Sequence, residues 1–185
     1  GMLIRNNRLD DAKSIFEELE RNFPDEIAYK NNTAFTDLLL NDYIGGEKKA
    51  RDALSLKPDD PVALCNLVTA LYMAGKRAEL KEYAEILAKC ETEEPVEIFK
   101  IATTFCEIKF DEEAFIWLEK LLKSSPYELD MLFLYGFAAF NCGKYEKFEE
   151  ALTDITTIDE SNAVAWFYRK FIILHRYHVH PVPIP

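Results

Sequence analysis

The chain has 185 residues, of which 49% are hydrophobic and 30% are charged, so it can bury a core and keep a polar surface. Its formal net charge of -11 disfavours nucleic acids and anionic membranes as partners, because both repel an acidic surface. The longest apolar run, residues 131–140, is shorter than the roughly 20 residues that span a bilayer. We therefore expect a cytoplasmic protein that binds neither nucleic acid nor membrane.

The first predicted element is a helix within residues 7–26, and one face of it is apolar. Nothing before it is long enough to form the other helix of a pair, so this face lacks its usual cover. Burying apolar surface is favourable by about 25 cal/mol per Å². We favour self-association, as in a homodimer, over the alternative that the chain is a fragment of a longer protein. The residues of this face are Leu9, Ala12, Ile15, Phe16 and Leu19.

Residues 27–160 are predicted to form four helix pairs, because several features recur every 34 residues. Pro24 and Pro58 are 34 residues apart, and Gly75 and Gly143 are 68 apart, which is twice 34. Glycine and asparagine tolerate the left-handed backbone of a tight turn, and Lys109 is the one exception in their column. This turn column holds Asn7, Asn41, Gly75, Lys109 and Gly143.

Apolar residues follow the same register. In the second helix of each pair they form columns three and four residues apart, which is one face of a helix. One column holds Phe16, Ala50, Ala84, Leu118 and Leu152, and another holds Leu19, Ala53, Leu87, Leu121 and Ile155. In the first helices the core stripe is Leu64, Leu67, Val68 and Leu71, and it recurs at Ile98, Ile101, Ala102 and Phe105. The predicted pairs span residues 27–60, 61–94, 95–128 and 129–160.

Local signals mark the helix ends. The pairs Asp60-Pro61 and Glu94-Pro95 indicate helix starts, since proline suits the first helical position. Segment 27–40 fits the pattern poorly, with Thr33 and Asp37 at positions where apolar residues are expected. A last helix over residues 161–178, with Ser161 as its N-cap, is expected to cover the final pair. Residues 179–185 are rich in proline and predict an extended tail.

The helix pairs resemble the tetratricopeptide repeat, a helix-turn-helix of 34 residues. The segments that carry the resemblance are Leu64-Cys65-Asn66-Leu67 with Ala70, Leu71 and Gly75, and Leu134-Tyr135-Gly136 with Gly143-Lys144-Tyr145. The aromatic residue usual at the start of the first helix is leucine or isoleucine here. The resemblance covers roughly residues 7–160. It implies an all-α, right-handed solenoid of helical hairpins with a C-terminal capping helix, in a single domain over residues 1–178.

The resemblance also implies a scaffold or adaptor that binds a protein or peptide on its concave side, which the first helices line. Asn66 occupies a column where members of the family often use asparagine to hold a peptide backbone. The helix over residues 130–141 is apolar on two faces, so its phenylalanines either form a groove for an apolar peptide or are covered by the last helix, the tail or a second subunit. The candidate binding residues are Asn66, Thr69, Tyr72, Met73, Phe99, Lys100, Thr103, Phe133, Phe137, Phe140 and Asn141.

Little in the sequence indicates an enzyme, and we expect no cofactor. The acidic runs at residues 111–113 and 146–150 lie at predicted helix starts, where negative charge favours the helix dipole. The four cysteines, Cys65, Cys90, Cys106 and Cys142, form no Cys-x-x-Cys pair and predict buried free thiols. A regulatory module that senses a peptide is the second hypothesis. A metal-dependent enzyme is the third, and it would use His175, His178 and His180.

Overall fold

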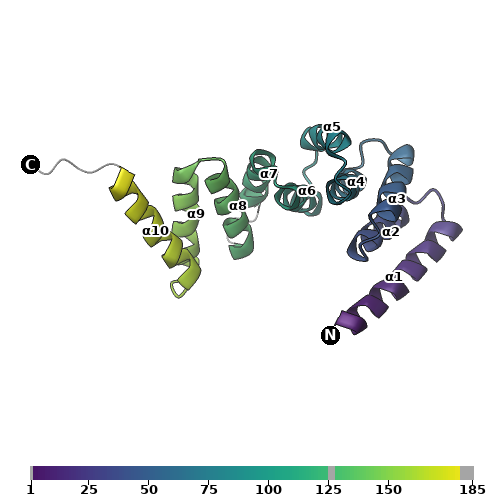
Figure 1. The fold of residues 1–185 in the computed structure, drawn as a ribbon, viewed down its shortest axis with the longest axis horizontal. Helices are drawn as coiled ribbons and strands as arrows, with labels where there is room; N and C mark the ends of the chain where they lie inside the picture. The colour runs from purple at the N-terminus through teal and green to yellow at the C-terminus, as the bar shows by residue number, and fades with distance from the viewer. Residues whose placement is uncertain (1, 125–127, 180–185) are drawn as a thin grey trace, which may run out of the picture. The chain divides into compact units, whose positions relative to one another are not determined.

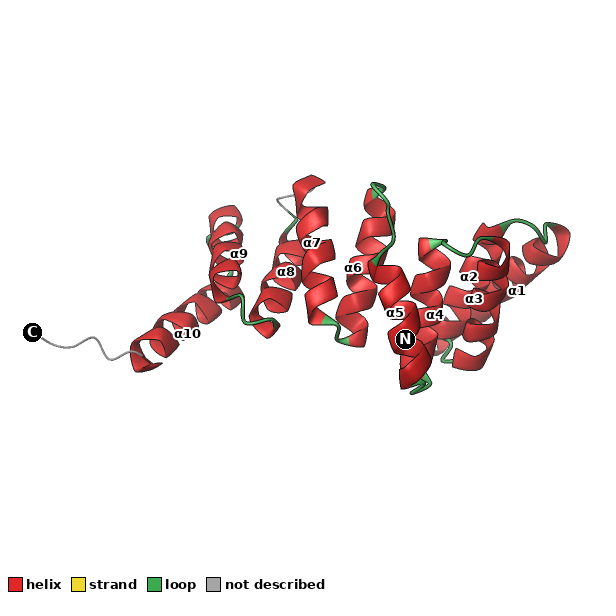
Figure 2. Ribbon diagram, turned by 90° about the horizontal axis from the view of Figure 1, so that it is seen from above, coloured by secondary structure: helices red, strands yellow, loops and turns green. Residues whose placement is uncertain are grey.

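In a computed structural model, the backbone is described for residues 2–124 and 128–179, and the side chains for residues 8–124 and 128–172. The described backbone consists of helices and the turns between them, without a strand (Figures 1 and 2). The chain divides into two compact units, which we name the N-terminal unit (Gly1–Ile108) and the C-terminal unit (Lys109–Pro185). The all-α class is confirmed, and the single domain over residues 1–178 stays a prediction.

The N-terminal unit contains the first six helices of the chain. Each helix from α1 to α4 packs on the next, and α4 also packs on α2 and α6. The first helices of the predicted pairs are therefore neighbours. The bounds are α1 (Met2–Asn22), α2 (Ile27–Leu39), α3 (Tyr43–Leu56), α4 (Pro61–Met73), α5 (Arg77–Ala88) and α6 (Pro95–Ile108).

The described part of the C-terminal unit contains four helices, and each packs on the next. Their bounds are α7 (Asp111–Ser124), α8 (Leu129–Asn141), α9 (Tyr145–Ile158) and α10 (Ala163–Val179). The N-cap predicted at Ser161 is wrong. Asn162 Oδ1 accepts the backbone N–H of Ala165 at 3.0 Å, whereas the Ser161 hydroxyl donates to Asp159 Oδ1 at 2.6 Å. The predicted tail, apart from the last helical residue, Val179, lies outside the described residues.

The repeat register determines which side chains form the core. Both described core stripes of the first helices are buried, as are the second-helix columns in α3, α5, α7 and α9. Asp60 and Pro61 start α4 as expected, with Asp60 Oδ1 accepting the backbone N–H of Ala63 at 2.9 Å. Hydrophobic periodicity therefore predicts both the helices and their buried faces.

The turn column differs from the prediction at two positions, Lys109 and Asn7. Lys109 has a φ of 63°, close to the 71° of Gly75 and the 73° of Gly143, so it adopts the left-handed turn despite its side chain. Asn7 does not form a turn, because α1 runs through it from Met2. Asparagine is only modestly unfavourable inside a helix, so its presence does not force a break.

Polar residues in α2 occupy core positions and find partners there. The Thr33 hydroxyl donates to the backbone carbonyl of Tyr29 at 2.9 Å. Asp37 is buried, and Lys13 Nζ of α1 lies 2.6 Å from its carboxylate. The poor fit of this segment to an apolar pattern therefore reflects satisfied polar groups, and α2 keeps the expected phase.

Candidate protein-binding surfaces

The first helices of the N-terminal unit present large apolar side chains on one side. Phe35 of α2, Tyr72 and Met73 of α4 and Phe99 of α6 are all exposed. Lys100 of α6 extends to α2, where its Nζ lies 4.2 Å from the centroid of the Phe35 ring. We call these five residues the N-terminal aromatic surface. Of them, the sequence prediction missed Phe35, although it shares a column with Thr69 and Thr103.

Three other predicted binding residues of this unit have partners within the chain or are partly covered. Asn66 is 1% exposed, and its amide donates to the backbone carbonyl of Asn31 at 3.0 Å, which joins α4 to α2. It thus holds a backbone, as the family resemblance implies, but that backbone belongs to this chain. The Thr103 hydroxyl donates to the carbonyl of Phe99 at 2.9 Å, and Thr69 is half-buried. We leave these three out of the surface.

The C-terminal unit carries a second aromatic row, contributed by α8 and α10. Its rings follow one another in contact: Phe133 to Phe137 at 6.3 Å between centroids, Phe137 to Tyr168 at 5.2 Å, and Tyr168 to Phe167 at 5.4 Å. Phe167 is 63% exposed. We call the following set the C-terminal aromatic surface: Phe133, Phe137, Phe140, Val164, Phe167 and Phe171.

The sequence prediction included only the α8 part of this surface. Phe167 and Phe171 lie 34 residues after Phe133 and Phe137, so extending the repeat by one unit would have found them. Phe137 packs edge-on against Tyr168 of α10, and both Phe133 and Phe137 are half-buried. The last helix therefore covers part of the row and adds exposed aromatic residues of its own.

Asn141, at the end of α8, binds within the unit. Its amide donates to Asp111 Oδ1 at 2.9 Å, near the start of α7. Lys144 Nζ lies 2.6 Å from Glu112 in the same region. The acidic first turn of α7 is thus used for contacts with the next pair of helices, and we leave Asn141 out of the C-terminal aromatic surface.

The apolar face of α1 is less covered than the same columns elsewhere. Phe16 and Leu19 are half-buried, whereas the residues at their positions in α3, α5, α7 and α9 are buried. Leu9 and Ala12 are also half-buried, and Ile15 is exposed. The structure thus leaves room for another surface against α1. Self-association through this face stays a prediction.

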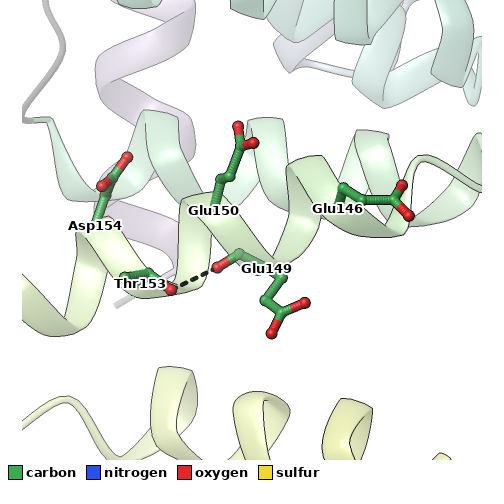
Figure 3. Close-up of a pocket in the computed structure, with 5 residues that line it drawn as sticks. All are labelled: Glu146, Glu149, Glu150, Thr153 and Asp154. Atoms are coloured by element: carbon green, nitrogen blue, oxygen red, sulfur yellow. Dashed lines mark hydrogen bonds between the residues drawn. The ribbon is translucent and has the colours of Figure 1, made fainter. Parts of the chain in front are cut away.

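The acidic residues of α9 line an open depression rather than an enclosed site. Figure 3 shows Glu150 and Asp154 pointing to one side of the helix, Glu149 to the opposite side and Glu146 along the helix. The Thr153 hydroxyl donates to the backbone carbonyl of Glu149 at 2.8 Å, and Glu150 pairs with Lys147 at 2.7 Å. Divergent, solvated carboxylates suit a helix surface and give no acid–base pair that faces a substrate.

Thiol and metal chemistry find no support in the described side chains. Burial raises the pKa of the Cys65 thiol to about 12, so the nucleophilic thiolate is scarce. The other three cysteines are half-buried rather than buried as predicted, and all four are free thiols. Within the described side chains, no three His, Cys, Asp or Glu residues are grouped to hold a metal ion. The histidines proposed as ligands, His175, His178 and His180, lie outside those side chains.

Comparison with known proteins gives the family. The sequence model for the coatomer epsilon subunit matches residues 3–117, which is more than half of the chain. The chain belongs to the coatomer epsilon subunit family. A comparison with curated protein sequences found no match. None of the helices in the described part of this family member is long and apolar enough to cross a membrane.

Solved structures similar to this family member are tetratricopeptide repeat proteins. YrrB, described as a TPR protein with an unusual peptide-binding site, is 14% identical, with a TM-score of 0.58 over 91% of this chain and 87% of its own. TTC0263 from Thermus thermophilus is 12% identical, with a TM-score of 0.59 over 94% of each chain. MamA from Desulfovibrio magneticus RS-1 is 14% identical, with a TM-score of 0.58 over 86% of this chain and 90% of its own. The tetratricopeptide-type fold is confirmed.

Proposed function

We propose that the protein is a non-enzymatic interaction scaffold that binds apolar segments of partner proteins on the exposed faces of its first helices. The observation that carries the proposal is the C-terminal aromatic surface, where Phe140, Phe167 and Phe171 remain exposed beside the half-buried Phe133 and Phe137. A contiguous patch of exposed aromatic side chains is typical of a protein-binding site.

Two comparisons support this proposal. The family is named for a subunit, so its members are described as parts of a larger assembly. YrrB, which shares the fold, is described as having a peptide-binding site. Apolar segments suit the surface because aromatic anchors gain free energy from burial without requiring charged partners.

Substitution of Phe167 with aspartate tests the proposal. Phe167 is 63% exposed, so the charge should not disturb the core, and it should abolish capture of partners from a lysate of the source cell. The matched control is Ile116→Asp on α7, because Ile116 is 60% exposed in the same unit and lies on a second helix. Capture should be lost with Phe167→Asp and retained with Ile116→Asp. Equal capture by both variants would contradict the proposal.

A further inference from the structure

One half-buried lysine of the N-terminal unit has no acidic partner. Lys13, Lys30, Lys49 and Arg51 are half-buried, and each has a carboxylate oxygen within 4.0 Å. Lys100 is the only other half-buried basic residue among the described side chains of this unit, and no described carboxylate lies within that distance of it. Its Nζ lies over the Phe35 ring instead, at 4.2 Å from the centroid.

The side chains that share the N-terminal aromatic surface with Lys100 carry no charge. The neighbouring members of the N-terminal aromatic surface are Phe35, Tyr72, Met73 and Phe99, and all four are exposed. Two acidic residues of α6 lie on either side of Lys100. Glu97, three residues before it, accepts the hydroxyl of Thr92, and its carboxylate is not within 4.0 Å of Lys100 Nζ. Glu107 is seven residues further along α6 and therefore about 10 Å away along the helix. The Thr103 hydroxyl donates to the backbone carbonyls of Phe99 and Lys100, so it does not offer its proton to a ligand.

This arrangement constrains what can bind. A partner that covers Phe35, Phe99 and Tyr72 would also remove the remaining water from the Lys100 ammonium group. A buried and unpaired charge is strongly unfavourable, and contact with one aromatic ring does not offset this. The cost falls when the partner supplies a carboxylate, because a charge-assisted hydrogen bond replaces the lost water. An apolar partner without an acid would bind poorly here.

We propose that the N-terminal aromatic surface binds a peptide segment in which one Asp or Glu side chain lies between large apolar side chains. The carboxylate pairs with Lys100 Nζ, while the apolar residues pack on Phe35, Phe99, Tyr72 and Met73. The acid is a side chain within the segment rather than a chain terminus, because a single lysine on an apolar face offers one contact. This inference rests on the proposed scaffold function and assigns the chemistry of its partner.

Selection of short random peptides displayed on phage, with both peptide ends fused, tests the inference. The unmodified chain should enrich Asp or Glu flanked by apolar residues. Lys100→Met keeps the length of the side chain without its charge and should remove the acidic preference. Lys100→Glu should select Lys or Arg at the same position. Acidic enrichment that is unchanged with Lys100→Met would overturn the inference.

Direct binding gives a second measurement, and its deciding comparison, two peptides on the unmodified chain, needs no variant of the protein. A synthetic copy of the selected peptide with Gln in place of Glu or Asn in place of Asp should bind the unmodified chain about tenfold more weakly or worse, and should bind Lys100→Met as tightly as the acidic peptide does. Equal affinities of the two peptides for the unmodified chain would overturn the inference, even if Lys100→Met failed to fold.

The remaining outcomes separate this inference from the scaffold function. Peptides that are apolar, carry no acid and are lost with Phe99→Asp would overturn the inference and leave the scaffold function standing. Failure to select any peptide, together with equal partner capture by Phe167→Asp and Ile116→Asp, would overturn both. Sedimentation that shows a dimer broken by Lys100→Glu would identify a second copy of the chain as the occupant and overturn the inference.

Discussion

Lys109 adopts a backbone conformation that suits glycine. Its φ of 63° matches those of Asn41, Gly75 and Gly143 at the same place in the register. The left-handed conformation costs a residue with a Cβ atom roughly 1–2 kcal/mol, and glycine avoids this cost. The local sequence at Lys109 disfavours the turn, so the turn forms because the 34-residue register requires it.

Replacing Lys109 with glycine is therefore expected to raise the free energy of unfolding by about 1 kcal/mol. Lys109→Ala is the control, because it makes the same change in charge and keeps a Cβ atom, and it should gain little. Urea denaturation followed by circular dichroism measures both. The converse change, Gly75→Ala, should destabilise by a similar amount through strain alone, since an added Cβ meets nothing within 4 Å. Equal effects of Lys109→Gly and Lys109→Ala would contradict the argument.

At the scale of the helix, ionic contacts hold α1 against α2 and α3 within the N-terminal unit. Lys13 Nζ lies 2.6 Å from Asp37 of α2, and Glu20 accepts from Lys49 of α3 at 2.9 Å. The Asp37 side chain is only 3% exposed. Burial raises the pKa of Asp37, although its hydrogen bond and attraction to Lys13 oppose the rise. The buried carboxylate therefore depends on a cation that α1 supplies.

Lys13→Ala should loosen α1 and lower the free energy of unfolding by about 1–3 kcal/mol, because it leaves a buried acceptor unpaired. Amide hydrogen exchange measures the loosening, and we expect it to be faster throughout α1. The Lys13→Arg variant should keep the α1 amides protected from hydrogen exchange. In the double variant Lys13→Leu with Asp37→Leu, no buried charge is left without its partner, so much of the stability should return. If the double variant were no more stable than Lys13→Ala, the pair would not be the cause.

The pH dependence of the Lys13→Ala variant follows from the same pair. The folded-state pKa of Asp37 is raised above its ordinary value of 3.8, so protonation of Asp37 favours folding. This contribution to stability is fully present at pH values below the unfolded-state pKa of Asp37, and it is lost as the pH rises through the folded-state pKa. Removing Lys13 should raise the pKa further. The variant should therefore regain more stability on acidification than the unmodified chain.

Periodicity predicts helices and columns well but not the polar partners that stabilise them. The second helices and the core stripes follow from the 34-residue register. The pairing of Asp37 with Lys13, and of Asn66 with the carbonyl of Asn31, joins residues 24 and 35 positions apart, and no local pattern encodes such partners. The N-cap of α10 at Asn162 rather than Ser161 shows that two adjacent cap-forming residues cannot be separated by sequence alone.

At the scale of the molecule, charge pairing differs between the two units. Glu20 and Glu47 are each only 12% exposed at the side chain. Glu20 joins α1 to α2 and α3 through Lys30 and Lys49, and Glu47 pairs with Arg51 of its own helix and with Lys76, the N-cap of α5. In the described part of the C-terminal unit, the ion pairs Lys144–Glu112 and Lys147–Glu150 have side chains that are at least 36% exposed. Acidification should therefore act mainly on the N-terminal unit.

The direction of that effect follows from the pKa of each carboxylate. Burial alone would raise the pKa of Glu20, but hydrogen bonds and attraction from Lys49 and Lys30 outweigh it and lower the pKa below 4.5. The pKa of Glu47 is lowered in the same way, against burial, by Lys76 and Arg51. A carboxylate whose pKa is lowered in the folded state stabilises the fold at pH values above its unfolded-state pKa. This stabilisation is lost as the pH falls through the folded-state pKa. Asp37 acts in the opposite sense, so a variant is needed to isolate Glu20.

Glu20→Gln should lower the free energy of unfolding at neutral pH by about 1 kcal/mol and weaken its decline below pH 4.5. Hydrogen exchange of α1 to α4 reports the N-terminal unit, while tryptophan fluorescence reports the C-terminal unit, because Trp117 and Trp166 are the only tryptophans of the chain. Glu18→Gln is the matched control, since Glu18 is exposed on the same helix and the change in charge is identical. Acid profiles that coincide for the two variants would show that the contacts of Glu20 with Lys30 and Lys49 do not stabilise the unit.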